Sequence, residues 1–156
     1  MTIVSIETGS PFVDDWVVNP KGSAIARSEW NPEPREFTIL AKEGRSWKRI
    51  YESRGGVEFS LQALSADGKS IIATGARGGD RVKVWSIPLD GSAISLQFEH
   101  PEHDVLYTVD DRFTGTPIGY QIGGGDMALT RPYLAQATHP LAGFTCTVGY
   151  DWGIGW

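Results

Sequence analysis

Apolar and polar residues alternate in short runs along most of the chain, and turn-forming sequences separate these runs. In residues 36–41, for example, Phe37, Ile39 and Ala41 fall on one face. Alternation over about four to eight residues is typical of a strand that buries one face. The pattern predicts strands at residues 2–6, 15–18, 24–30, 36–41, 47–51, 59–64, 70–74, 81–87, 94–98, 104–109 and 118–122.

One kind of turn recurs at nearly constant spacing. It stands at residues 19–22 (Asn-Pro-Lys-Gly), 65–68 (Ser-Ala-Asp-Gly) and 112–115 (Arg-Phe-Thr-Gly), so its glycines lie 46 and 47 residues apart. A period of about 40–50 residues built from short strands is typical of β-propeller blades. Because one blade cannot bury both of its faces alone, the repeat also predicts dependence on neighbouring blades.

We therefore predict an all-β fold: a partial β-propeller of about two and a half four-stranded antiparallel blades, followed by an irregular C-terminal tail. The partial propeller spans residues 1–125 and opens with the strand at 2–6. Its blades lie at about 11–55, 56–102 and, incomplete, 103–125. The tail at 126–156 shows neither alternation nor a sustained helical period, and a short helix near 128–137 is its one candidate element. An offset of 46 aligns Ile39 with Trp85, so the repeats share a strand pattern and little residue identity.

Composition narrows the class of protein. Hydrophobic residues make up 40% of the 156 and charged residues 21%, which is ordinary for a globular domain. The net charge of −5 argues against a nucleic-acid or anionic-membrane surface, since both need clustered Lys and Arg. The single Cys146 allows no intrachain disulfide and leaves the redox compartment open. No apolar run approaches the roughly 20 residues of a membrane helix, and residues 1–10 do not form a signal peptide; the location is therefore left unknown, with the cytoplasm expected for the chain as it stands.

Two serines stand in partial nucleophile motifs. A serine hydrolase places its nucleophile in a G-x-S-x-G turn between a strand and a helix. Ser46 and Ser70 each follow a glycine by two residues, but neither has the second glycine, and both fall beside predicted hairpin turns. We assign no catalytic residue, and the chain as it stands is not expected to be an enzyme.

Two further segments resemble ligand sites. His100, Glu102, His103 and Asp104 could bind zinc if they converged, but Pro101 interrupts them and the polar loop between two blades is the favoured interpretation. Residues 123–126 (Gly-Gly-Gly-Asp) follow a strand as a phosphate-binding loop would, yet Asp126 would repel phosphate and no lysine follows. We therefore predict a linker at 123–126, and no metal or cofactor.

Charged and aromatic residues complete the candidates. Residues 77–81 (Arg-Gly-Gly-Asp-Arg) predict a solvated hairpin, with contact to a substrate or another domain as the alternative. Neighbouring residues on a strand point to opposite faces, so the pairs at 14–15 and 110–111 are not expected to share a proton. The remaining set is aromatic and is assigned to packing between blades: Trp16, Trp30, Trp47, Trp85 and Phe98.

Several of these segments, in this order, resemble one known family. They are residues 15–22 (Asp-Trp-Val-Val-Asn-Pro-Lys-Gly), 24–27 (Ala-Ile-Ala-Arg), Trp47-Lys48, 64–70 (Leu-Ser-Ala-Asp-Gly-Lys-Ser) and 98–105 (Phe-Glu-His-Pro-Glu-His-Asp-Val). Together they resemble propeller blades of the prolyl oligopeptidase family of serine peptidases, most closely its acylaminoacyl-peptidase and dipeptidyl-peptidase-like bacterial branch. The likeness covers about residues 2–125.

The resemblance implies a function without catalysis in this chain. In that family a β-propeller precedes an α/β-hydrolase domain, covers its active site and filters peptides by size. The chain would then be a fragment of that propeller, and its partners would be the rest of the propeller, the hydrolase domain and, through them, peptide substrates. None of the family's catalytic positions is present. The alternative is a free-standing β-repeat module that binds a protein. A fragment leaves exposed sheet edges, which are expected to favour self-association, whereas a module would protect its terminal repeats.

Overall fold

The fold is all-β, as predicted. A computed structural model describes residues 8–111, 114–123 and 127–129, which form eleven strands and no helix. No helix of this part is therefore long and apolar enough to cross a membrane. The strands are β1 (Val13–Val18), β2 (Ala24–Asn31), β3 (Glu36–Glu43), β4 (Ser46–Arg54), β5 (Ser60–Leu64), β6 (Ser70–Gly75), β7 (Lys83–Pro88), β8 (Ser95–Phe98), β9 (Val105–Asp110), β10 (Pro117–Ile122) and β11 (Met127–Leu129).

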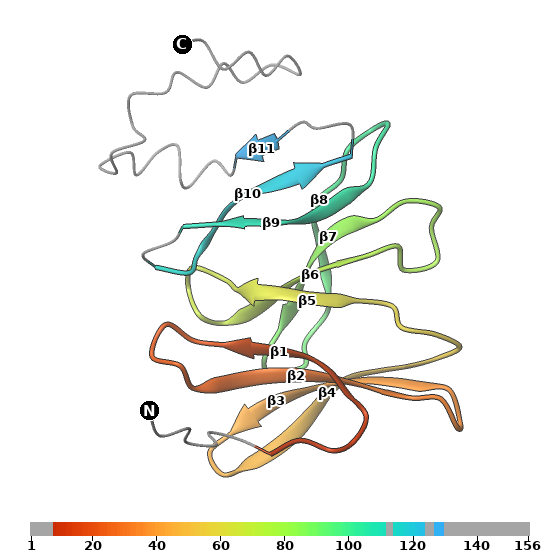
Figure 1. Ribbon diagram of the computed structural model, residues 1–156, viewed down its shortest axis with the longest axis vertical. Helices are drawn as coiled ribbons and strands as arrows, with labels where there is room; N and C mark the ends of the chain where they lie inside the picture. Colours follow the sequence, from red (N-terminus) through yellow and green to blue (C-terminus); the bar gives the residue numbers. More distant parts are fainter. Residues whose placement is uncertain (1–7, 112–113, 124–126, 130–156) are drawn as a thin grey trace, which may run out of the picture.

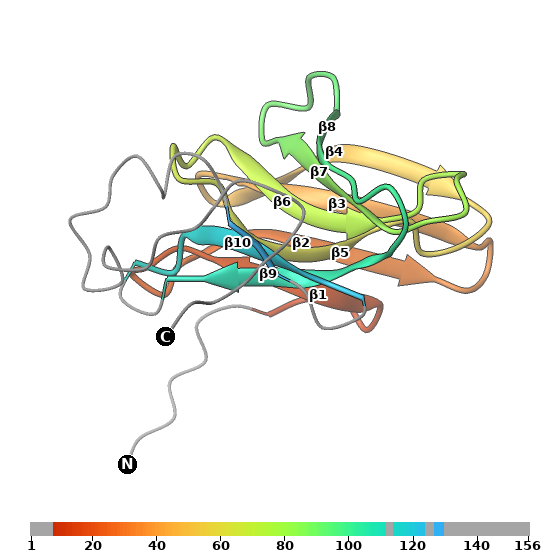
Figure 2. The ribbon, with the colours of Figure 1, turned by 90° about the horizontal axis from the view of Figure 1, so that it is seen from above.

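The strands form three antiparallel sheets in chain order. Sheet 1 holds β1 to β4, sheet 2 holds β5 to β8, and sheet 3 holds β9 to β11, with each strand paired to its neighbours in sequence. Figure 1 shows the three sheets following one another along the long axis of the molecule, and Figure 2 shows them from above. The first strands of neighbouring sheets are in contact, because β5 contacts both β1 and β9. Each four-stranded meander therefore has the form of a propeller blade.

Alternation along β6 explains how sheet 2 packs on both sides. Ile71 and Ala73 belong to the core shared with sheet 1, whereas Ile72, between them in sequence, belongs to the core shared with sheet 3. Successive side chains of a strand point to opposite faces, so one apolar run serves two interfaces. The core between sheets 1 and 2 comprises Val17, Ala26, Phe37, Ile39, Phe59, Leu61, Ile71, Ala73 and Ile87, and that between sheets 2 and 3 comprises Ile72, Val84, Val105 and Tyr120.

A chain of edge-to-face aromatic contacts crosses the first interface. Tyr51 lies with its ring centroid 6.5 Å from Phe37 and 5.2 Å from Phe59, and Phe59 lies 6.3 Å from Trp85. The Tyr51 hydroxyl donates to the Glu58 carboxylate. Burial and this neighbouring carboxylate both raise the pKa of Tyr51. Aromatic pairs in this geometry contribute about 0.5–1.5 kcal/mol beyond their buried area, which favours a fixed spacing of sheets 1 and 2.

The two repeats align less simply than the offset of 46 predicts. Ser28 of β2 pairs with Ile39, and its counterpart Thr74 of β6 pairs with Val84. Ile39 therefore corresponds to Val84 and not to Trp85. The predicted alignment was wrong by one residue in this strand because ten residues separate Ser28 from Ile39, whereas nine separate Thr74 from Val84.

Sheet 3 extends beyond residue 125, where the alternating pattern ends. β11 pairs with β10 through Gln121–Met127, Tyr120–Ala128 and Gly119–Leu129. The prediction of an irregular tail was therefore wrong for residues 127–129, and the candidate helix near 128–137 was wrong at its start. A strand of three residues is too short to show an alternating period in the sequence. The predicted strand at 2–6, the rest of the tail and Cys146 lie outside the described residues.

Candidate functional site

The recurring turns meet around one hollow. It encloses about 510 Å³ and is lined by residues 16–20, 62–68, 110 and 114–116. These stretches are the C-terminal ends of β1, β5 and β9 with the turn that follows each. Segments that recur along the sequence therefore come together in space, because the three first strands lie side by side.

A polar side chain closes each of the first two turns. Asn19 Oδ1 accepts hydrogen bonds from the amides of Lys21 (3.0 Å) and Ser23 (2.9 Å). In the second turn, Asp67 Oδ1 accepts from the Ser65 hydroxyl (2.6 Å) and the Lys69 amide (3.1 Å). Such side-chain bonds to nearby backbone are what make Asn, Asp and Ser favourable at turns. The mouth of the hollow is thus built from locally determined loops.

Asp111 organises the third turn, a role that was not predicted for this half of an acidic pair. Its Oδ1 accepts from the Thr114 amide (2.9 Å), and its carbonyl accepts from the Gly115 amide (2.7 Å). Asp111 is buried, while its neighbour Asp110 is exposed and lines the hollow. Asp111 directly follows β9, as Asn19 directly follows β1, and this position was the signal for its role.

The electrostatic character of the hollow is acidic. Hydrogen bonds from Ser65 and the Lys69 amide lower the pKa of Asp67, whereas partial burial raises the pKa of Asp110 against an opposing hydrogen bond from Thr108. No Lys, Arg or His occurs among the described lining residues. The arrangement suits binding of a polar or cationic group.

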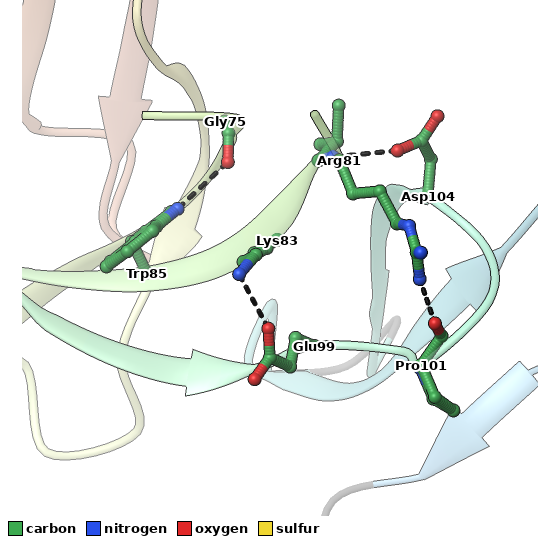
Figure 3. A network of polar contacts seen from close by, with 8 residues as sticks. Gly75, Arg81, Lys83, Trp85, Glu99, Pro101 and Asp104 are labelled. Carbon is green, nitrogen blue, oxygen red and sulfur yellow. Dashed lines mark hydrogen bonds and ion pairs between the residues drawn. The ribbon is translucent and has the colours of Figure 1, made fainter. Parts of the chain in front are cut away.

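Two segments that were predicted as separate loops, residues 77–81 and 100–104, meet at the boundary of sheets 2 and 3. Figure 3 shows Arg81, from the turn after β6, donating to the carbonyl of Pro101 in the loop before β9. The Asp104 carboxylate accepts from the Val82 amide (2.7 Å), and the Val105 amide donates to the Val82 carbonyl (3.0 Å). Residues 81–82 are therefore hydrogen-bonded to the loop that leads into sheet 3.

The same network continues along β7. Lys83 forms an ion pair with Glu99 (2.6 Å), and the Trp85 indole donates to the Gly75 carbonyl (2.9 Å; Figure 3). Arg77, the other arginine of its turn, lies 5.0 Å from the Trp85 ring. The arginines at 77 and 81 thus contact the protein itself, which accounts for them without a substrate.

The loop that carries His100 and His103 is held by hydrogen bonds within itself. His100 Nδ1 accepts from the amides of Glu102 (3.2 Å) and His103 (3.0 Å), and the two imidazole rings stack 5.1 Å apart. Within the described part of the chain, no three His, Cys, Asp or Glu side chains gather as a metal site would require. These contacts are those of a structured loop joining two sheets.

The other candidates fall in places of little chemistry. The Ser46 hydroxyl donates to the Glu43 carbonyl in a hairpin, and Ser70 donates its amide to Ser65 Oγ. Asp14 is exposed, whereas Asp15 turns the other way, toward sheet 2. Residues 124–126 of the glycine-rich segment lie outside the described residues.

The aromatic prediction was correct for three residues and wrong for two. Trp30 and Trp85 pack against the core of sheets 1 and 2, and Phe98 stacks on Tyr120 between sheets 2 and 3. Trp16 and Trp47 instead lie together on the face of sheet 1 turned away from sheet 2, with ring centroids 5.8 Å apart. Sequence alone did not distinguish them because all five occupy strand-like positions.

Comparison with known proteins adds no relative. The chain matches no protein-family model, no curated protein and no solved structure.

Proposed function

We propose that the chain contributes consecutive blades to a β-propeller that binds peptides at the ends of its first strands and performs no catalysis of its own. The observation that supports this most directly is the hollow shared by the turns after β1, β5 and β9. In propellers the blades are arranged radially around a central channel. The hollow would be part of the wall of that channel.

The resemblance to the prolyl oligopeptidase family supplies the biological context of the proposal. There the propeller admits peptides to a hydrolase domain, so this chain would belong to the part that filters substrate. The turns at 19–22 and 65–68 carry much of the resemblance, and both line the hollow. The acidic lining is compatible with a peptide, whose free amino end or basic side chains are cationic.

The serine nearest to the hollow supports a role in binding. Ser65 donates its hydroxyl to Asp67 and accepts from the Ser70 amide, so its oxygen organises the turn. The histidine that usually activates a nucleophilic serine is absent from the described lining of the hollow. We expect a fluorophosphonate probe not to label the chain.

A free-standing protein-binding module is the second candidate. It is favoured by the polar residues on the far face of sheet 1, where Arg27 pairs with Glu29 at 2.8 Å. A terminal repeat with a polar outer face is what a self-contained repeat protein requires.

Binding of short synthetic peptides tests the leading proposal. Fluorescence anisotropy with labelled peptides would compare the wild-type chain with Asp110→Asn, which changes the hollow, and Asp90→Asn, which changes an exposed turn outside it. We expect peptides carrying Lys or a free amino end to bind the wild type and Asp90→Asn and to bind Asp110→Asn more weakly. Absence of binding to every peptide, or binding that Asp110→Asn does not alter, would contradict the proposal.

A further inference from the structure

The outer strands of sheets 1 and 2 occupy equivalent places. β4 and β8 each end their sheet, so one side of each strand has no described neighbour within the sheet. Tyr51 of β4 pairs with Ile39. Phe98 of β8 pairs with Val84, the counterpart of Ile39 in sheet 2. A register shift follows these pairs at the same place in both strands, so the two edges can be compared residue by residue.

The edge of β4 is protected in two ways. Lys48 and Arg49 place two exposed cations on it, and charged side chains on an edge hinder pairing with a further strand. The turn between β7 and β8 also lies against it. Lys48 Nζ donates to the Asp90 carbonyl at 3.1 Å. A Cβ on Gly91 would lie 3.7 Å from Ile50 Cα, so sheet 2 covers part of this edge.

The edge of β8 has neither protection. Ser95 and Leu96 stand where β4 has its two cations, and residues 91–98 contain no charged side chain. The first three residues of β8 are exposed, with Leu96 at 43%. Among the described residues, the backbone of β8 forms hydrogen bonds with β7 alone. The N–H and C=O groups on the other side of β8 are therefore available to an added strand.

The size of this edge selects the kind of partner. A strand of 4 residues is about 13 Å long. A stable interface between two proteins buries roughly 1,200–2,000 Å², which pairing along so short a strand does not approach. Two copies of the chain would also repel each other, because each carries a net charge of −5. A short extended peptide needs only main-chain hydrogen bonds along the edge and a few side-chain contacts.

We propose that the outer edge of β8 binds an extended, uncharged peptide segment of a partner protein, which joins sheet 2 as a further strand. Main-chain hydrogen bonds to β8 hold the segment, and one of its apolar side chains packs on Leu96. Carboxylates in the segment are disfavoured, because Asp90 and Glu99 flank this stretch. None of the described residues that line the hollow belongs to β8, so this site is separate from the one in the proposed function.

Binding of a capped peptide to the full chain tests the proposal. The probe is a short peptide of alternating Val and Thr, acetylated, amidated and labelled with a neutral dye, so it offers the hollow neither Lys nor a free amino end. Ser95→Lys with Leu96→Arg gives β8 the residues of the β4 edge. The control, Ser46→Lys with Val57→Arg, makes the same kinds of change at exposed positions outside β8. We expect the wild type and the control to bind alike and the β8 variant to bind at least tenfold more weakly.

Hydrogen exchange in the wild type locates the bound peptide. We expect the amides of β8 to exchange more slowly with peptide present, while those of the turns at 19–22 and 65–68 stay unchanged. No binding, equal binding by all three proteins, or protection of the turns in place of β8 would overturn the proposal. So would protection of β8 that rises with protein concentration without peptide, because a second copy would then occupy the edge. Asp110→Asn should leave this binding unchanged, so failure here and failure of the proposed function can be told apart.

Discussion

The Asp15 carboxylate of β1 accepts a hydrogen bond from the backbone amide of Leu61 in β5 at 3.0 Å. The same Oδ2 accepts from the Ser60 hydroxyl at 3.2 Å, and the Asp15 amide donates to the buried Ser28 hydroxyl at 3.1 Å. One residue thereby joins the first strands of two sheets, and these strands carry the turns of the hollow.

We predict that Asp15→Ala destabilises the fold. The substitution leaves the Leu61 amide without its acceptor at a partly buried interface, and hydrogen bonds to charged groups contribute about 1.5–3 kcal/mol. Urea unfolding should show a loss in this range. The exposed neighbour provides the control: Asp14→Ala should change the free energy of unfolding by less than about 0.5 kcal/mol. Equal effects of the two substitutions would argue against the inter-sheet role.

A second prediction concerns the close approach of sheet 2 to the segment that enters it. A Cβ on Gly75 would lie 2.1 Å from the Glu58 carbonyl oxygen and 2.9 Å from Phe59 Cδ1. Gly75→Ala should therefore force backbone apart and cost about 1–3 kcal/mol by overpacking, measured as a lower Tm. Gly56→Ala is the matched control, because nothing lies within 4 Å of its Cβ. A Tm for Gly75→Ala as high as that of the control would contradict the packing described.

The raised pKa of Tyr51 predicts how the free energy of unfolding changes at alkaline pH. Its pKa is raised above the unfolded value of 10.0 by burial and by Glu58. The stabilisation from keeping this hydroxyl protonated is therefore complete below pH 10 and is lost as pH rises through the folded pKa. Unfolding free energy measured against pH should fall more gently above pH 10 in Tyr51→Phe than in the wild type. A residual slope is expected from Tyr120, whose pKa burial also raises. An unchanged slope in Tyr51→Phe would exclude Tyr51 as a cause.

The raised pKa of Asp110 predicts an effect of the same sign at the hollow, in the acidic range of pH. Burial raises its pKa, so the folded state favours the neutral acid and is destabilised as pH rises above the unfolded pKa near 3.8. Asp110→Asn should therefore be slightly more stable than the wild type at pH 7, and the difference should vanish below pH 3.8. If the same variant also binds peptides less well, the carboxylate is kept for function at a cost in stability. A variant less stable than the wild type at pH 7 would contradict this account.

Local chemistry explains which parts of the fold the sequence could predict. The turn at residues 19–22 depends on Asn19 bonding to amides two and four residues away, and such contacts are readable from a short stretch. Strand alternation in β3 likewise follows from its own residues, with Phe37 and Ile39 buried on one face. The four-stranded sheets could therefore be predicted almost strand by strand.

What could not be predicted depends on contacts between distant segments. The hollow exists only because β1, β5 and β9 meet. The hydrogen bond from Arg81 to the Pro101 carbonyl likewise joins residues from two loops. Trp47 was expected in a core because tryptophan on a strand usually packs there. Its place beneath Arg27 and Lys42 follows from sheet 1 having no described sheet on its far side.

The face of sheet 1 turned away from sheet 2 carries Arg27 and Lys42, at the positions that Ala73 and Ile87 hold in sheet 2, and exchanging these residues yields a prediction. Arg27→Ala combined with Lys42→Ile gives this face the residues that Ala73 and Ile87 supply in sheet 2. The variant exposes Trp16 and Trp47 on an apolar surface of the kind that sheets use to stack, so we expect its mass in sedimentation velocity to rise with concentration more steeply than that of the wild type. The control is Lys21→Ile with Arg45→Ala, which makes the same changes at exposed turn positions. Equal association of variant and control would attribute the effect to lost charge, whereas association of the variant alone would show that the two cations keep this face closed.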